Sequence, residues 1–93
     1  MKKRVVVTGM GIVSPLGLGL KENETALFEG RSGIDYIKTF TPEEDFPVKI
    51  AGEVKGFDPQ QYIDHKDVKK MDRFIHYAVA CSKMALADSG FEI

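Results

Sequence analysis

The sequence predicts an α/β fold built in layers, and three segments indicate it. Residues 5–7 are three consecutive valines without polar alternation, which is typical of a strand covered on both faces. Residues 48–55 alternate apolar and polar side chains, which predicts a half-exposed strand. Residues 65–88 have a helical pattern, and from residue 73 onward few positions are polar, so this helix is expected to be buried.

The first strand leads into a glycine-rich turn and then into a short helix. The turn contains residues that favour irregular backbone: Gly9, Gly11, Ser14, Pro15, Gly17 and Gly19. The spacing predicts a helix from Leu20 to Glu29, ended by Gly30 just after its C-cap. Its apolar stripe is thin, because Asn23 and Glu24 stand where apolar residues are expected.

The middle of the chain is expected to be mostly loop before the second strand. Residues 31–47 contain the turn-forming pairs Ser32-Gly33 and Thr41-Pro42. One face of the strand at 48–55 carries Val48, Ile50, Gly52 and Val54. After it, Asp58 and Pro59 predict the N-cap and first residue of a helical turn that reaches about Ile63.

The last helix is predicted from about His65 to Asp88, either continuous or broken near Asp72, and Ser89-Gly90 ends it. Its C-terminal part is apolar nearly all round, and its alanines permit close backbone approach. A chain this short has few other residues that could pack against such a helix and bury it. We therefore expect its packing partners to lie beyond Ile93 or on another chain.

Composition narrows the class of protein. The chain has 93 residues, which is one domain at most, and a net charge of −1, which favours neither nucleic acid nor an anionic membrane as a partner. Cys81 is the single cysteine, so an internal disulfide is excluded and a reducing compartment is favoured. The apolar run after Lys2, Lys3 and Arg4 is too short for a signal peptide or a membrane span. We expect a cytoplasmic protein with its native start.

The glycine turn permits a dinucleotide-binding hypothesis, which its details disfavour. Residues 9–14 follow a strand, as that fingerprint requires. However, Ser14 replaces the third glycine, Pro15 follows at once, and no strand-ending acidic residue about 20 positions on is available to bind a ribose. Glycines that allow tight turns in close-packed layers are the better interpretation, and no cofactor is expected.

The residue types that most often carry chemistry are not arranged for it. An activated cysteine needs a helix N-terminus or a cationic neighbour, whereas Cys81 lies in the middle of a helix and is expected to be a buried structural thiol. His65 and His76 are eleven residues apart, without other ligands at metal-binding spacing, so both are expected at the surface or at a helix edge. We predict no catalytic residue and no metal ligand.

A basic stripe is the strongest candidate for a binding site. On a helix, Lys66, Lys69, Lys70 and Arg73 fall within about 100° of one another. Three aspartates flank them, so an ordinary solvated face is one interpretation. The other is a docking site for an acidic partner, because complementary charge accelerates encounter.

Five motifs in this order resemble the N-terminal quarter of the bacterial β-ketoacyl-acyl-carrier-protein synthases, the type II elongation enzymes above all. The first two are Val5-Val6-Val7-Thr8-Gly9-Met10-Gly11-Ile12-Val13-Ser14-Pro15-Leu16-Gly17 and Gly30-Arg31-Ser32-Gly33-Ile34. The others are Ala51-Gly52-Glu53-Val54, Lys70-Met71-Asp72-Arg73-Phe74 and Ala85-Leu86-Ala87-Asp88-Ser89-Gly90. One departure is Glu24, where the family often has a large aromatic residue.

The resemblance implies that residues 1–93 are the N-terminal fragment of the first half of a thiolase-like fold, a five-layer αβαβα body that is usually a homodimer. It implies an acyltransferase of fatty-acid biosynthesis, which elongates an acyl chain by decarboxylative Claisen condensation with malonyl carrier protein. The family's catalytic cysteine, histidines and lysine lie further along its sequence, so this segment alone is expected to be inactive. The resemblance also implies that Lys66, Lys69 and Lys70 help dock the acidic carrier protein, with Arg73 as a helical neighbour.

Two alternatives remain open at this point. One is a stand-alone module that binds the carrier protein without chemistry, and the other is a segment of a polyketide ketosynthase. A module should bury the helix at 73–88 within its own residues, whereas a fragment should leave it exposed or paired with another copy.

Overall fold

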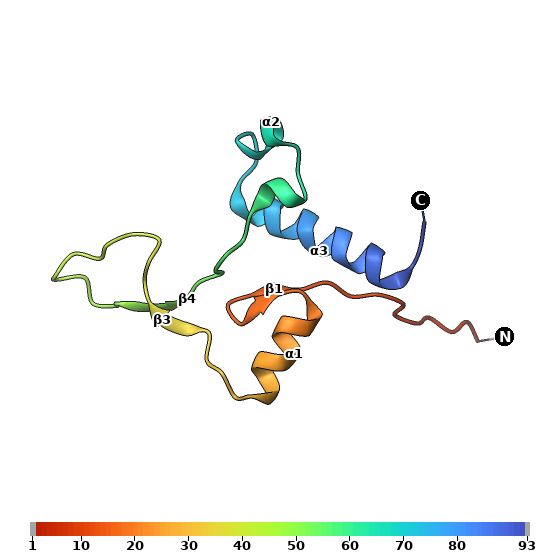
Figure 1. The fold of residues 1–93 in the computed structure, drawn as a ribbon, viewed down its shortest axis with the longest axis horizontal. Coiled ribbons are helices and arrows are strands. Elements are labelled where there is room, and N and C mark those ends of the chain that lie inside the picture. The colour runs from red at the N-terminus through yellow and green to blue at the C-terminus, as the bar shows by residue number, and fades with distance from the viewer. Residues whose placement is uncertain (1, 93) are drawn as a thin grey trace. The chain divides into compact units, whose positions relative to one another are not determined.

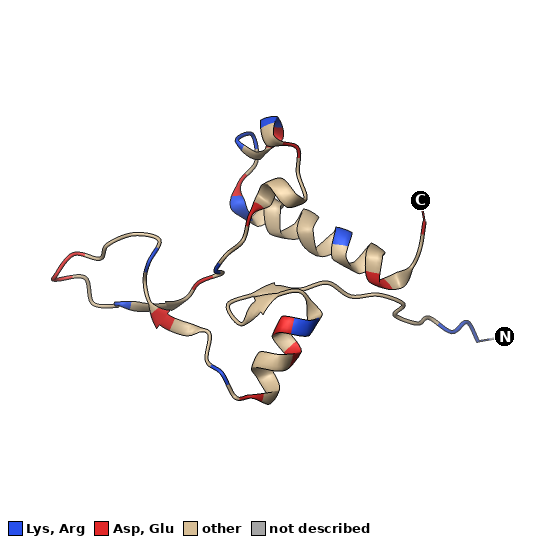
Figure 2. Ribbon diagram, in the orientation of Figure 1, with Lys and Arg blue, Asp and Glu red and all other residues tan. Residues whose placement is uncertain are grey.

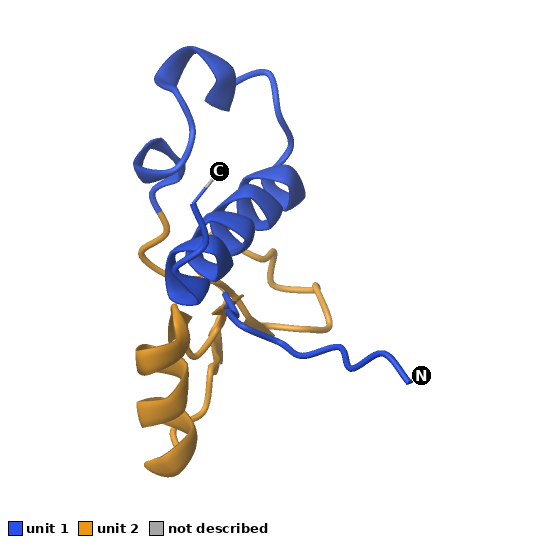
Figure 3. Cartoon of the chain, turned by 90° about the vertical axis from the view of Figure 1, so that its right-hand side faces the viewer, with its two compact units in different colours: residues 1–12, 58–93 blue, residues 13–57 orange. Residues whose placement is uncertain are grey.

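The computed structural model describes residues 2–92 and contains helices and strands, as the predicted α/β class requires (Figure 1). The chain divides into two compact units (Figure 3). The first comprises residues 1–12 and 58–93, and the second comprises residues 13–57.

The second unit begins with a small hairpin and a helix. Strand β1 (Val13–Ser14) pairs antiparallel with β2 (Gly17–Leu18), so part of the predicted irregular turn is a short two-stranded ladder. Helix α1 spans Leu20–Phe28, and Gly30 follows its C-cap with a φ of 70°. That φ is one that glycine adopts readily, so the predicted helix end is confirmed.

A second antiparallel pair completes this unit. Strand β3 (Ile34–Tyr36) pairs with β4 (Ile50–Gly52), with Tyr36 opposite Ile50. Residues 31–47 are mostly loop, as predicted, but β3 was not expected within them, and the predicted strand at 48–55 is shorter than expected. Three-residue strands are formed by their cross-strand partner rather than by a local pattern, so sequence periodicity misses them.

In the first unit, helical segments follow one another in the order η1, α2 and α3. The 3₁₀ turn η1 (Pro59–Gln61) begins as predicted, because the Asp58 side chain accepts a hydrogen bond from the Gln60 backbone N–H at 3.0 Å. Helix α2 (His65–Val68) and helix α3 (Arg73–Ser89) are separate, which confirms the predicted break near Asp72. Gly90 ends α3 in the left-handed conformation, with a φ of 72°.

The expected first strand does not form. Residues 5–7 are extended but unpaired and exposed, Val5 at 93%. Strand formation needs hydrogen-bonding neighbours, and none of the strands within residues 2–92 pairs with this segment. The side chains of the three valines are therefore not packed against other residues in the part of the chain that the structure describes.

Beyond the valines, the chain lies against α3 within the first unit. A Cβ atom on Gly9 would lie 2.3 Å from the Ala85 carbonyl oxygen, and one on Gly11 would lie 2.2 Å from that of Cys81. The Met10 backbone N–H donates to the Asp88 carboxylate at 3.0 Å. Neither glycine has a positive φ. These two glycines are thus needed for close approach of two backbones, which agrees with the close-packing interpretation.

Helix α3 is less buried than its composition predicts. His76 and Ala80 are its buried residues, whereas Phe74 is 69% exposed and Leu86 is also exposed. The helix is exposed in this way because little of the described chain packs on it. Such exposure is expected of a fragment rather than of a self-contained module.

Candidate functional site

The four cations of the predicted docking site are all exposed and occupy neighbouring positions in the first unit. Lys66 lies in α2, Lys69 is its C-cap, Lys70 follows, and Arg73 is the first residue of α3. Figure 2 shows their basic positions at α2, in the loop after it and at the start of α3. We call these four residues the basic cluster.

The basic cluster is not a stripe on one helix, so the predicted geometry is wrong. Helix α2 ends at Val68, and α3 begins five residues later. Asp72 between them has extended backbone, with a ψ of 162°. Hydrogen bonds from the Lys70 and Met71 N–H groups to the Asp67 and Val68 carbonyls make the turn. The cluster therefore lies at the end of α2, in the turn after it and at the start of α3, which we call the α2–α3 corner.

Most of the basic cluster is available to a partner. Lys70 Nζ lies 4.0 Å from the Asp67 carboxylate, an exposed pair of the kind that contributes little to stability. Within the described residues, Lys66, Lys69 and Arg73 form no ion pair. The four cations have three aspartates near them in the sequence, so the local net charge is weakly positive.

Two side chains of α3 bind backbone carbonyls in the segment that precedes this helix. His76 Nε2 is 2.9 Å from the Val68 carbonyl oxygen, at the end of α2. Lys83 Nζ donates to the Tyr62 carbonyl, just after η1. His76 lies near the N-terminal edge of α3, one of its two expected locations, but it is only 8% exposed, and contact with the chain preceding α3 explains the burial. His65 is exposed, as expected.

The structure brings together no catalytic or metal-binding group from these candidates. Within residues 2–92, no three His, Cys, Asp or Glu side chains are placed to hold a metal ion. Cys81 is half-buried in the middle of α3, where the backbone N–H groups are used within the helix rather than directed at the sulfur. The expectation of a buried thiol is therefore wrong for the described residues, while the mid-helix position of Cys81 is as expected.

The dinucleotide hypothesis lacks its structural context. The fingerprint requires a helix that opens directly after the glycine turn. Here residues 13–18 form the β1–β2 hairpin, and α1 begins only at Leu20. Gly9 and Gly11 are close against α3, so their backbone is not free to approach a phosphate.

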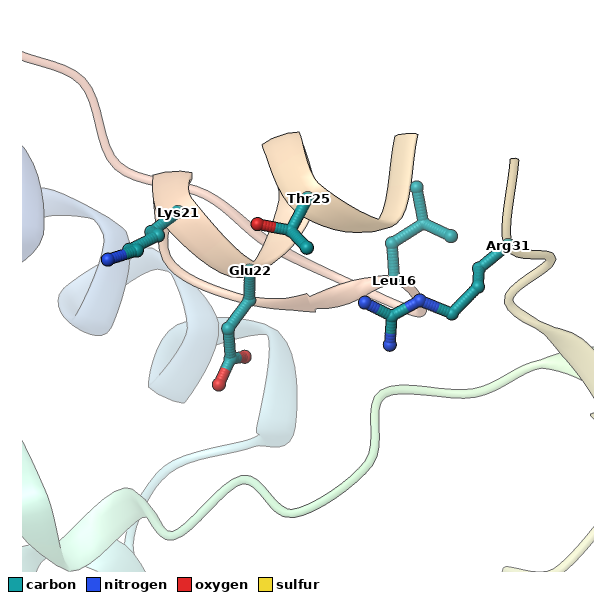
Figure 4. Close-up of a pocket in the computed structure, with 5 residues that line it drawn as sticks. All are labelled: Leu16, Lys21, Glu22, Thr25 and Arg31. Carbon is teal, nitrogen blue, oxygen red and sulfur yellow. The ribbon is translucent and has the colours of Figure 1, made fainter. Parts of the chain in front are cut away.

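An open hollow of about 470 Å³ lies beside α1 in the second unit (Figure 4). Its lining residues are Leu16, Lys21, Glu22, Thr25 and Arg31. The Glu22 carboxylate already accepts from the Leu18 N–H, and Arg31 Nε pairs with Glu29 at 2.8 Å. The lining carries charges of both signs, and two of the three charged side chains are engaged within the chain, so the hollow does not define a ligand.

Asn23 is the residue that sequence reasoning missed in this unit. Its side-chain amide is buried and donates to the Gly17 and Gly19 carbonyls at 3.0 and 2.8 Å. The Ser14 hydroxyl donates to its carbonyl oxygen. Asn23 thereby ties α1 to the β1–β2 hairpin. Glu24, the departure from the family pattern, lies exposed on α1.

Two carboxyl groups near the β3–β4 pair, those of Asp35 and Glu53, have pKa values below the usual ones. Hydrogen bonds from the Thr39 hydroxyl and the Lys38 backbone N–H lower the pKa of Glu53. A hydrogen bond from the Tyr36 N–H, followed by the Lys38 ammonium, lowers the pKa of Asp35. Both groups are at the surface, so they stabilise local structure rather than define a reactive site.

Comparison with known proteins connects this geometry to one family. Residues 2–93 match the family model described as the N-terminal domain of β-ketoacyl synthases. The chain is 49% identical over 92 residues to 3-oxoacyl-[acyl-carrier-protein] synthase 2 of Vibrio cholerae and 47% identical over 88 residues to that of Synechocystis. These alignments cover 99% and 95% of the chain but only 22% and 21% of the relatives. The chain thus spans about a fifth of their length.

A solved structure, the ishigamide ketosynthase/chain length factor, has the same fold over the aligned part. It superposes with a TM-score of 0.83 at 39% identity, covering 94% of this chain and 21% of its own. No helix within residues 2–92 is both long and apolar enough to cross a membrane. The motifs, the fold and the relatives agree, and the chain belongs to the β-ketoacyl synthase family, whose N-terminal domain it matches.

Proposed function

We propose that the protein containing this chain is a β-ketoacyl-acyl-carrier-protein synthase that elongates fatty acyl chains. The observation that carries the proposal is the 47–49% identity of this chain, over 95–99% of its residues, to relatives named 3-oxoacyl-[acyl-carrier-protein] synthase 2. Residues 1–93 form the N-terminal part of the first thiolase-like half, and the complete protein is a five-layer homodimer of the cytoplasm.

The reaction has two stages. An acyl group moves from a carrier-protein thioester to an active-site cysteine thiol, and the carrier thiol is released. Malonyl carrier protein then loses CO₂, and the resulting carbanion attacks the acyl-enzyme carbonyl. A carbon–carbon bond forms, the cysteine thiolate leaves, and a 3-ketoacyl carrier thioester is the product. We place the reacting residues in the remainder of the protein, since this chain spans about a fifth of its relatives' length.

The contribution of this chain is to bind the carrier protein. The basic cluster offers four exposed cations at the α2–α3 corner, and three of them form no ion pair within residues 2–92. An acidic carrier is attracted to such a surface, and the attraction weakens as salt screens it. The cluster therefore acts on encounter and on KM for the carrier rather than on the chemical step.

The other two interpretations have less support. A stand-alone binding module should bury its final helix, whereas Phe74 and Leu86 of α3 are exposed. For the polyketide alternative, the solved ketosynthase/chain length factor is 39% identical to this chain, which is lower than the 49% identity to the Vibrio cholerae enzyme.

The test uses the full-length protein with malonyl carrier protein. Lys66→Glu combined with Lys70→Glu should weaken carrier binding about tenfold at low salt and flatten its salt dependence. Lys2→Glu combined with Lys21→Glu makes the same charge change at exposed positions outside the cluster and should have little effect. Equal affinities for the cluster variant and the wild type at low and high salt would reject the docking role.

Catalysis is tested separately. The full-length protein should form a 3-ketoacyl product and release CO₂ from acyl and malonyl carrier proteins, whereas residues 1–93 alone should form none. A full-length protein without this product would refute the proposed reaction.

A further inference from the structure

We infer that His76 is a positioning residue for the docking site: its buried ring sets the end of α2 and thereby the arrangement of the basic cluster. The inference rests on the docking function proposed above and deepens it, because it names the residue that holds the cluster in place without touching the partner.

The hydrogen bond has one possible direction. A carbonyl oxygen can only accept, so His76 Nε2 carries a proton and donates it to the Val68 carbonyl at 2.9 Å. The same oxygen accepts a longer bond from the Met71 N–H at 3.4 Å. Both lone pairs of the last carbonyl of α2 are thus used, one within the turn and one by a side chain of α3.

Helix α2 depends on such an outside donor because it is short. A four-residue helix leaves most of its terminal carbonyls without an intrahelical partner. Its N-cap, Asp64, makes no side-chain capping bond, so the N-terminal end receives no compensating support of that kind. The His76 ring therefore supplies an anchor that the segment cannot provide from its own residues.

The anchor lies at the centre of the cluster. Val68 is flanked by Lys66, Lys69 and Lys70, each within two positions along the chain. Arg73 precedes His76 by three residues on α3 and therefore lies on the same side of that helix. Fixing the Val68 carbonyl to His76 consequently fixes the three lysines relative to Arg73.

Further contacts hold the preceding segment to the same helix. Lys83 Nζ donates to the Tyr62 carbonyl, and the next residue, Ile63, is buried. His76 and Lys83 are seven positions apart, about two turns of α3, and therefore lie on one face of it. The segment from η1 to α2 is thus fastened at two points, of which His76 is the one beside the cluster.

The experiment compares two substrates in the full-length protein, so that docking is separated from general stability. For each variant, kcat/KM is measured with malonyl carrier protein and with malonyl pantetheine, which has no carrier to dock. The quantity compared is the substrate ratio, kcat/KM for malonyl carrier protein divided by kcat/KM for malonyl pantetheine. His76→Leu should lower this ratio about fivefold, through KM for the carrier, because the donor to Val68 is lost. His76→Gln should restore it, because the Gln side-chain amide can donate at a similar reach.

A matched control lies on the same helix. The Ser82 hydroxyl donates to the Ala78 carbonyl within α3, at an exposed position. Ser82→Ala removes one side-chain hydrogen bond to a carbonyl without releasing α2, so the substrate ratio should stay at the wild-type value.

Four results would overturn the inference. An equal fall in kcat/KM for both substrates in His76→Leu would mean that the ring only stabilises the fold. A Gln variant as impaired as the Leu variant would mean that the hydrogen bond is not responsible. A lowered ratio in Lys66→Glu with Lys70→Glu, but not in His76→Leu, would retain the docking site and reject the positioning role. An unchanged ratio in the lysine variant would reject the docking function itself, and this inference with it.

Discussion

The N-terminal segment of the first unit and helix α1 of the second unit are held in place by different physical means. In the first unit, backbone packs directly on backbone, because Gly9 and Gly11 let the N-terminal segment lie against α3. In the second unit, polar side chains bind the backbone at turns, as Asn23 does beside α1 and Glu53 does near β3. Large buried apolar side chains contribute little to either unit, since Ile63 is the largest apolar residue in the described core.

The difference teaches which interactions this stretch of chain satisfies by itself. No buried side-chain polar atom within residues 2–92 lacks a hydrogen-bond partner. Apolar burial is incomplete, as the exposed valines at 5–7 and Phe74 show. Polar contacts at turns need only nearby residues, whereas a hydrophobic core needs several elements from distant parts of a chain. Two substitutions and one change of pH in the full-length protein test this contrast.

The largest effect is expected from Gly11→Val in the first unit. A Cβ at this position would lie 2.2 Å from the Cys81 carbonyl oxygen, so the segment must move away from α3. We expect the free energy of unfolding to fall by about 3 kcal/mol, measured by urea denaturation. Met10→Ala, at the exposed neighbouring residue, should cost less than about 1 kcal/mol. Similar losses for both variants would contradict the close-packing interpretation.

A smaller effect is expected from Asn23→Leu in the second unit. The substitution removes both amide donors to the Gly17 and Gly19 carbonyls, and the leucine cannot replace them. The loss should be about 2 kcal/mol in the free energy of unfolding. Glu24→Gln changes the adjacent exposed residue and should be nearly neutral. If Asn23→Leu were as stable as the wild type, apolar packing rather than polar contact would hold α1.

The smallest effect is expected from acid at the β3–β4 pair. The pKa of Glu53 is lowered by its bonds to Thr39 and Lys38, so its stabilisation is present above the usual glutamate pKa. That stabilisation is lost as the pH falls below about 4, through the lowered folded-state pKa. Amide hydrogen exchange at Lys38 and Thr39 should accelerate in this range, and Glu53→Gln should remove the pH dependence.

Glu44→Gln provides the control for the acid response, because its side chain is exposed and outside the hydrogen bonds to Lys38 and Thr39. It should leave the exchange profile unchanged. A wild-type profile without any acid response at Lys38 would show that the Glu53 carboxylate does not hold this turn.

Sequence reasoning succeeded where a structural feature depends on neighbouring residues. Gly30 and Gly90 end their helices with positive φ, and Asp58 caps η1, as predicted from residue type and position. It failed for β3, whose three residues form a strand only because β4 pairs with them. It also missed the burial of His76, because burial of that ring depends on contacts made by the chain before α3.

The candidate site shows the same division. Which side chains are basic and exposed could be predicted from the sequence, and all four members of the cluster are exposed. Their arrangement could not, since a continuous helix would align them in a stripe, whereas the break at Asp72 distributes them around a corner.

By itself, the sequence determined the family, the α/β class and the helix ends, because ordered motifs, capping residues and glycines act over a few neighbouring positions. The tertiary structure alone decided that Gly9 and Gly11 serve backbone contact, that Asn23 is a buried tie and that His76 anchors α2. Those roles depend on atoms far apart in the sequence, whose approach no local pattern encodes.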